Sequence, residues 1–123
     1  MADTIALGKA AETEGAKYLQ EAGYKIIDRN YSSPFGEIDV IAKEKNDIVF
    51  VEIKFRSSID FGRPGEFVNK NKQSKILKTA IHYLKRKNLT KSNIRFDVLA
   101  LGPEINQIEL IKSAFDSPSL YRY

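Results

Sequence analysis

Four charged side chains lie at strand-like spacing in segment 36–56, which reads GEIDVIAKEKNDIVFVEIKFR. Glu37 and Asp39 are two residues apart, and so are Glu52 and Lys54. Because side chains two apart on a strand point to the same face, each pair would share one face of its strand. The opposite faces would carry apolar residues that pack into a core, namely Ile38, Val40, Val51, Ile53 and Phe55.

The polar stretch Lys43–Asp47 joins two apolar runs and suits a hairpin loop. In the right register, strands about 5 Å apart make Asp39 and Glu52 cross-strand neighbours, with Lys54 beside them. Like charges that face each other destabilise a strand pair, so these acids need a cation. With one His and no Cys in the chain, carboxylate ligands predict Mg²⁺ or Mn²⁺ as the cofactor.

A hairpin with one solvated face would show the same alternation, and Glu52 and Lys54 would then form an exposed ion pair of little energetic value. The run 48–55 is nevertheless apolar enough for a strand that is covered on both sides. Lys and Glu are seldom fully buried without a partner. We therefore favour a site over a solvated face.

The order of Asp39, a strand and turn, and then Glu52-Ile53-Lys54 has the shape of the Asp…(Asp/Glu)-x-Lys pattern of nucleases. Asp39 and Glu52 would hold a metal that lowers the pKa of water and polarises a phosphate. Lys54 would orient the attacking water or stabilise the developing charge. Glu12, expected on the first helix, would reach the site through the metal or its waters. A solvated helix glutamate is the alternative for Glu12.

Two helices and five strands must position these residues. Helices are expected over 4–22, ended by Gly23, and over 67–87, each with an apolar stripe at helical spacing. The strands are expected over 24–31, on each side of the polar turn, over 94–101 and over 107–112.

The order α-β-β-β-α-β-β predicts an α/β fold with a mixed sheet and helices on its two faces, in a single domain over 1–123. A loop is expected at 57–66, where Gly and Pro gather, and a coil tail at 113–123.

The net charge of +4 is unevenly distributed, because the segment 67–96 holds nine bases and no acid. A basic segment beside an acidic cluster suggests an anionic polymer as the partner, most simply DNA. A solvated basic helix face is the alternative for the lysines. The candidate phosphate contacts are Arg56, Arg63, Lys70, Lys72, Lys75 and Lys78.

Composition excludes several classes of site. Without Cys there are no disulfides, thiolate nucleophiles or Cys-ligated zinc, and one His excludes a His cluster. No apolar run approaches the ~20 residues of a membrane span, and the N-terminus does not resemble a signal peptide. We expect a cytoplasmic protein with no membrane partner.

The chain also resembles the YraN-like family of small bacterial proteins, which look like Holliday-junction resolvases within the restriction-endonuclease-like superfamily. The resemblance covers about 8–114. Its marks are Gly8-x-x-x-Glu12, Tyr18-Leu19, Gly23-Tyr24, Arg29-Asn30-Tyr31, Gly36-Glu37-Ile38-Asp39, Phe50-Val51-Glu52-Ile53-Lys54, Arg56-Ser57, Phe61-Gly62-x-Pro64, Val68, Lys72-Gln73 and Arg95-Phe96-Asp97-Val98.

This resemblance implies the αβα sandwich of the superfamily. It nominates as site residues Glu12, Asp39, Glu52 and Lys54. Gln73, in the second-helix block, would support the site from a second layer. Glu37 shares the face of Asp39 by its strand spacing and would either support the site in the same way or simply close the edge of the strand.

We expect a metal-dependent endonuclease that hydrolyses phosphodiester bonds in DNA, branched or otherwise structured, without reading its sequence. The alternative is a non-catalytic nucleic-acid-binding module that recruits a repair or recombination partner. A small structural protein with solvated charged faces is a third interpretation. A homodimer would let a resolvase-like enzyme cut two strands symmetrically.

Overall fold

The computed structural model describes residues 4–55, 68–102 and 107–116. The predicted order of elements is confirmed, with boundaries shifted by a few residues. The elements are α1 (Thr4–Glu21), β1 (Lys25–Ser33), β2 (Gly36–Glu44), β3 (Asp47–Phe55), α2 (Lys70–Arg86), β4 (Asn93–Leu101) and β5 (Ile108–Ile111). The predicted loop at 57–66 and the tail beyond 116 lie outside the described residues. Among the described helices, none is long and apolar enough to cross a membrane.

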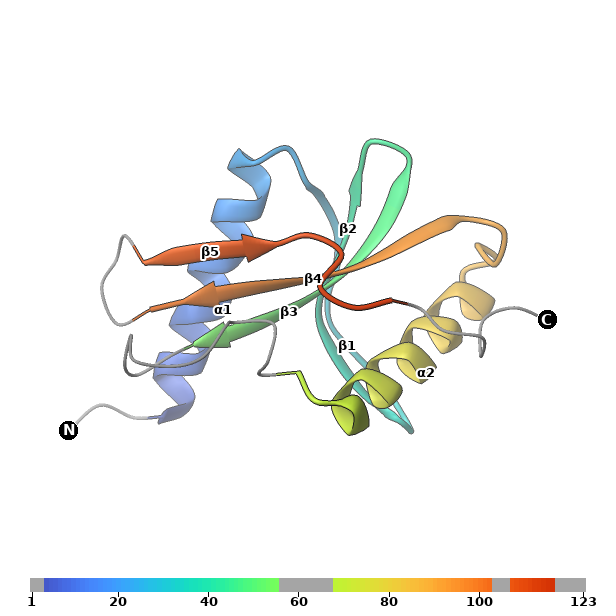
Figure 1. Ribbon diagram of the computed structural model, residues 1–123, viewed down its shortest axis with the longest axis horizontal. Helices are drawn as coiled ribbons and strands as arrows, with labels where there is room; N and C mark the ends of the chain where they lie inside the picture. The colour runs from blue at the N-terminus through green and yellow to red at the C-terminus, as the bar shows by residue number, and fades with distance from the viewer. Residues whose placement is uncertain (1–3, 56–67, 103–106, 117–123) are drawn as a thin grey trace.

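The strands form one mixed sheet in the order β1-β2-β3-β4-β5. β3 and β4 are parallel, and all other neighbours are antiparallel. Parallel neighbours need a long crossover connection, and here the connection contains α2. Figure 1 shows α1 behind β3, β4 and β5, and α2 on the near side of the sheet.

The hairpin turn between β2 and β3 is tighter than the sequence predicts. β2 continues to Glu44 and β3 begins at Asp47, so only Lys45 and Asn46 lie between the two strands. Lys45 has a φ of 55°, in the left-handed region that tight hairpin turns use. The expectation of a five-residue polar loop is therefore wrong, because Lys43 and Glu44 pair with β3.

The sheet carries a hydrophobic core on each face. On the α2 side, Phe50 stacks on Phe96 with ring centroids 5.6 Å apart, and Leu84 of α2 packs against this cluster. On the α1 side, Leu19 packs against Val51 and other apolar residues of the central strands. Burial of β3 on both faces explains why its sequence is an almost unbroken apolar run.

The alternation of faces along β2 breaks at Asp39. Ile38 packs on the α2 side, whereas Val40, two residues later, packs on the α1 side. The last pair between β2 and β3 is Val40 with Val51, although β2 stays paired with β1 as far as Gly36. β2 thus separates from β3 at Asp39, and the expectation that Ile38 and Val40 share a face is wrong. Phe55, also expected in the core, is 43% exposed.

α1 lies close against the sheet at Gly15. A Cβ atom at this position would lie 2.9 Å from Cδ1 of Ile53 and 3.1 Å from Cδ2 of Leu99. The glycine therefore permits a close approach of helix and sheet. Because Glu12 precedes Gly15 by about one helical turn, this contact sets the height of Glu12 above β2.

Candidate active site

Asp39 stands where β2 leaves β3. Its Oδ2 accepts a hydrogen bond from the backbone N–H of Ile53, 2.8 Å away. The Asp39 side chain thus takes the place of a β2 backbone carbonyl as the acceptor for the Ile53 N–H, because the backbone pairing of β2 and β3 ends at Val40 and Val51. Glu52 is the position opposite Asp39, one step beyond the last strand pair, so the predicted cross-strand neighbours do come together.

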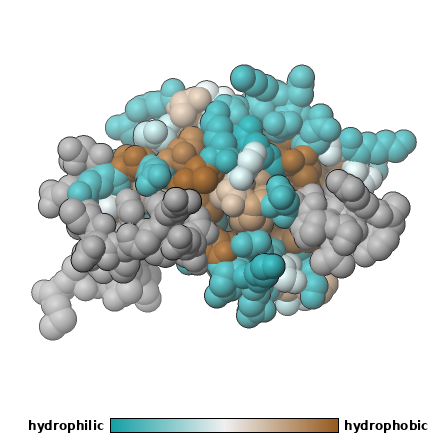
Figure 2. Space-filling view, in the orientation of Figure 1, coloured by the Kyte–Doolittle hydropathy of each residue, from teal (hydrophilic) through white to brown (hydrophobic). Residues whose placement is uncertain are grey.

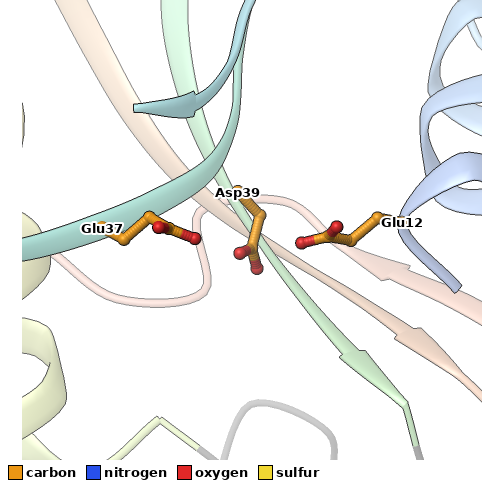
Figure 3. A group of neighbouring side chains, drawn as sticks. All are labelled: Glu12, Glu37 and Asp39. Atoms are coloured by element: carbon orange, nitrogen blue, oxygen red, sulfur yellow. The ribbon is translucent and has the colours of Figure 1, made fainter. Parts of the chain in front are cut away.

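Two further carboxylates lie close to that of Asp39. One carboxylate oxygen of each of Glu12, Glu37 and Asp39 lies within 4.8 Å of the others. Figure 3 shows the side chains pointing toward one another, Glu12 from α1 and the other two from β2. Glu37, predicted as a supporting residue, is thus part of this cluster, and its Oε2 accepts a hydrogen bond from the Ser32 hydroxyl at 3.2 Å.

Glu52 is buried, with only 8% of its surface exposed. Its Oε2 makes no hydrogen bond to the described residues, although Nζ of Lys72 lies 3.2 Å from it. The ammonium is at ion-pair distance but in a poor direction for a hydrogen bond. A buried carboxylate oxygen without a hydrogen bond is unfavourable, so this atom is suited to receive a cation.

The crowding of acids changes their protonation. Burial raises the pKa of Asp39 to about 8, aided by a hydrogen bond with Glu52 and by the charge of Glu52. Burial also raises the pKa of Glu12, and the charge of Asp39 adds to this effect. A divalent cation would favour the ionised form of each group.

The donor set fits a hard divalent metal. It consists of carboxylate oxygens, which are the ligands that Mg²⁺ and Mn²⁺ prefer. It also includes the buried Glu52 oxygen, for which the described residues provide no hydrogen bond. Asp39 lies between Glu37 and Glu12 (Figure 3) and also neighbours Glu52, so these acids can supply further ligands.

Other predicted site residues have different positions. Lys54 is half-buried, and the alternation of β3 places it on the face of Glu52, opposite Ile53. Gln73 donates a hydrogen bond from Nε2 to the Val68 carbonyl at 2.8 Å, which ties the start of α2 to the residue before its cap.

The predicted phosphate contacts divide into three groups. Lys70, Lys75 and Lys78 are exposed along α2, and Figure 2 shows hydrophilic side chains gathered where this helix begins. Lys72 is turned toward Glu52 instead. The remaining two, Arg56 and Arg63, lie outside the described residues.

Sequence reasoning missed a second charged cluster, centred on Arg95. This guanidinium makes two hydrogen bonds of 2.9 Å to Asp97 and an ion pair of 2.8 Å to Glu44. Asp97 is 1% exposed and also accepts a hydrogen bond from the Tyr24 hydroxyl at 2.7 Å. Lys112 binds the other Glu44 oxygen at 2.8 Å, and this bond lowers the pKa of Glu44.

The acids of this cluster are bound closely by Arg95 and Lys112, whereas at the Asp39 site Lys72 lies 3.2 Å from Glu52 without a hydrogen bond to it. It joins β4 to β2, to the start of β1 and to the segment after β5. Three residues of this cluster, Tyr24, Arg95 and Asp97, stand in the family blocks Gly23-Tyr24 and Arg95-Phe96-Asp97-Val98, which could have indicated it. These blocks therefore include residues that hold the sheet together, and not only residues of the candidate site.

Comparison with known proteins assigns the family. Residues 11–101 match the family described as "Uncharacterised protein family UPF0102". A UPF0102 protein of Syntrophus aciditrophicus (strain SB) is 48% identical over 94% of this chain and 93% of the relative. One of Rhodococcus opacus (strain B4) is 44% identical over 94% and 100%, and one of Sulfurihydrogenibium sp. (strain YO3AOP1) is 43% identical over 92% and 96%. The chain therefore belongs to the UPF0102 family, the YraN-like family that its motifs resemble.

Proposed function

We propose that this protein is a metal-dependent nuclease that hydrolyses phosphodiester bonds in DNA. The observation that carries the proposal is the pairing of Asp39 with Glu52. Two carboxylates lie together at the point where two strands separate, and one of their buried oxygens lacks a hydrogen bond to the described residues. A divalent cation would bind such a pair where β2 separates from β3, between two inner strands of the sheet.

The position of each residue in the site suggests its role in the reaction. Asp39 and Glu52 would hold Mg²⁺ or Mn²⁺, and a metal of this kind supplies activation of water and polarisation of the phosphate. Lys54, on the Glu52 face of β3, would hold the attacking water or neutralise charge that develops on the phosphate. Glu12 and Glu37 would accept hydrogen bonds from water at the open side of the cluster.

The surroundings of the site support an anionic polymer as substrate. α2 carries exposed lysines, and the same helix places Lys72 beside Glu52. Phosphate contacts of this kind give affinity without sequence readout. The element order and the two helical layers are those implied by the resemblance to restriction-endonuclease-like enzymes, and branched or structured DNA is the substrate class implied by Holliday-junction resolvases.

Two further expectations belong to the proposal. A homodimer would place two such sites for symmetric cutting of two strands. A chain without Cys, in which no described helix could span a membrane, suits the bacterial cytoplasm, where its DNA substrate lies.

A second candidate is a non-catalytic nucleic-acid-binding module that recruits a repair or recombination partner. One observation favours it, namely the Lys72–Glu52 ion pair, which partly neutralises the acidic site without metal. The two candidates differ in whether substitution of Asp39 removes a chemical activity or leaves only binding to be measured.

Cleavage of end-labelled DNA tests the proposal. The substrates are duplex, single strand, flap and four-way junction, each with Mg²⁺ and with Mn²⁺. We expect cleavage by the wild type and by Glu14→Gln, which changes an exposed carboxylate on α1, and none by Asp39→Asn. Equal cleavage by Asp39→Asn would refute the site. Salt-sensitive binding without cleavage by any variant would favour the binding module.

A further inference from the structure

We infer that Lys72 is a resident counter-cation of the acidic site, and that its release from Glu52 couples metal binding to phosphate binding. The inference rests on the proposed function, because it assumes that a metal binds at Asp39 and Glu52. It assigns Lys72 a positioning role that differs from a simple phosphate contact.

The backbone of Lys72 is fixed while its side chain is not. Its N–H donates to Oδ1 of Asn69, the N-cap of α2, at 2.8 Å, and the N–H of Gln73 donates to the Asn69 carbonyl at 2.8 Å. The side chain then reaches from this anchored first turn to Glu52, and 41% of it remains exposed. A flexible stem on a fixed base allows the ammonium to move between two partners.

The contact with Glu52 is an incomplete one. The ammonium lies 3.2 Å from Oε2, yet that oxygen has no hydrogen bond to the described residues. The second cluster shows the contrast, because Arg95 binds Asp97 there through two hydrogen bonds of 2.9 Å. Lys72 therefore neutralises Glu52 by charge, without the directed bonds that would lock it in place.

A metal would compete with this ammonium. Both cations would need the same buried oxygen, and two positive charges at that distance repel each other. A phosphate at the mouth of the site would give Lys72 a second anion to bind. Departure of Lys72 to the phosphate would free Glu52 for the metal, so each ligand would strengthen the binding of the other by the same factor.

Calorimetric titration with Mn²⁺ alone tests the first half of this inference. We expect Lys72→Met to bind Mn²⁺ about tenfold more tightly than the wild type, a typical size for coupling between sites. Lys17→Met, which removes an exposed charge from α1, should stay close to the wild type. Lys72→Arg restores a cation and should return the affinity toward the wild-type value, which a folding defect in Lys72→Met would not do.

Repetition with a short duplex of phosphorothioate DNA tests the second half. The duplex should raise the Mn²⁺ affinity of the wild type and of Lys17→Met, but not that of Lys72→Met. Equal or weaker Mn²⁺ binding by Lys72→Met would overturn the inference. Asp39→Asn separates this failure from failure of the proposed function, because only the latter predicts Mn²⁺ binding by Asp39→Asn equal to that of the wild type.

Discussion

The Asp39 carboxylate accepts a hydrogen bond from the backbone N–H of Ile53, 2.8 Å away, where β2 separates from β3. The bond holds Asp39 against β3 beside Glu52, and carboxylate oxygens of Glu12 and Glu37 lie within 4.8 Å of a carboxylate oxygen of Asp39. Asp39 is therefore the residue that joins the two halves of the acidic site. The first two predictions concern its charge.

The stability of the metal-free protein should fall as pH rises. The folded-state pKa of Asp39 is raised, chiefly by burial, from its ordinary 3.8 to about 8. Between these values the unfolded chain has lost the proton that the folded protein keeps, so unfolding becomes easier as pH increases, and the loss levels off above about 8. Thermal unfolding in EDTA should show this decline, and Asp39→Asn should reduce it. If the melting temperature fell equally with pH in the wild type and in Asp39→Asn, the raised pKa would not belong to Asp39.

Metal binding at neutral pH should release a proton. Because Asp39 is protonated below about 8 in the metal-free protein, a metal that takes its carboxylate must displace that proton. Calorimetry of Mn²⁺ binding in buffers with different ionisation enthalpies measures the number released. The exposed-carboxylate control Glu14→Gln should release the same number as the wild type. Binding with no proton release would mean that the metal avoids Asp39.

The Arg95 cluster should determine stability and leave metal binding alone. Arg95→Met would strand the buried Asp97 without its cation, and breaking a buried pair in this way costs about 3–5 kcal/mol. Urea unfolding measures the loss, with the exposed Lys91→Met expected within about 0.5 kcal/mol of the wild type. A folded Arg95→Met protein that lost Mn²⁺ affinity would show that the two clusters are not separate.

The close contact at Gly15 should be needed to position Glu12. Gly15→Leu would force atoms into the space of Ile53 and Leu99 and lift α1 from the sheet, at a cost of about 1–3 kcal/mol. We expect weaker Mn²⁺ binding than in the wild type, but stronger than in Asp39→Asn. Of the four acids of the site, Glu12 is the one that α1 carries, so it moves with the helix while the other three stay on the sheet. The Cβ of Gly15→Ala would crowd only the terminal methyl groups of these side chains, so this variant should change both stability and Mn²⁺ affinity less. Unchanged Mn²⁺ affinity in a destabilised Gly15→Leu would remove Glu12 from the site.

The exposed lysines of α2 should control the salt dependence of DNA binding. Lys75→Ala and Lys78→Ala should each lower the log–log salt slope by about 1, as expected for loss of one phosphate contact. Lys17→Ala, which removes an exposed lysine from α1, is the matched control and should leave the slope unchanged. Slopes equal to the wild type in both α2 variants would exclude this helix from the interface.

Local pattern was sufficient for most of the fold. Gly23 marks the end of α1, with a positive φ of 96°, and the apolar run of β3 indicates a strand covered on both faces. The pairing of Asp39 with Glu52 followed from hairpin geometry, because the two positions are adjacent in the register that the short turn sets.

The rest depends on contacts that a local pattern does not contain. Ile38 and Val40 are both apolar, so their spacing cannot show that the strand turns between them. Arg95 finds its partners at Tyr24 and Glu44, far away in the sequence, and the charge pattern of β4 alone does not indicate them. The contact of Lys72 with Glu52 likewise depends on where α2 begins above the sheet.

The most direct test of the metal site is paramagnetic broadening of backbone amide signals by traces of Mn²⁺. The described part of the chain contains two carboxylate clusters, and of these the Arg95 cluster is the one whose acids form hydrogen bonds or close ion pairs with Arg95 and Lys112. We predict that the amides of Asp39 and Ile53 broaden first and that those of Arg95 and Asp97, one strand farther from the site, broaden only at higher Mn²⁺ concentration. Broadening first at Asp97, or evenly over the acids of both clusters, would contradict a metal site at Asp39 and Glu52 and with it the proposed nuclease.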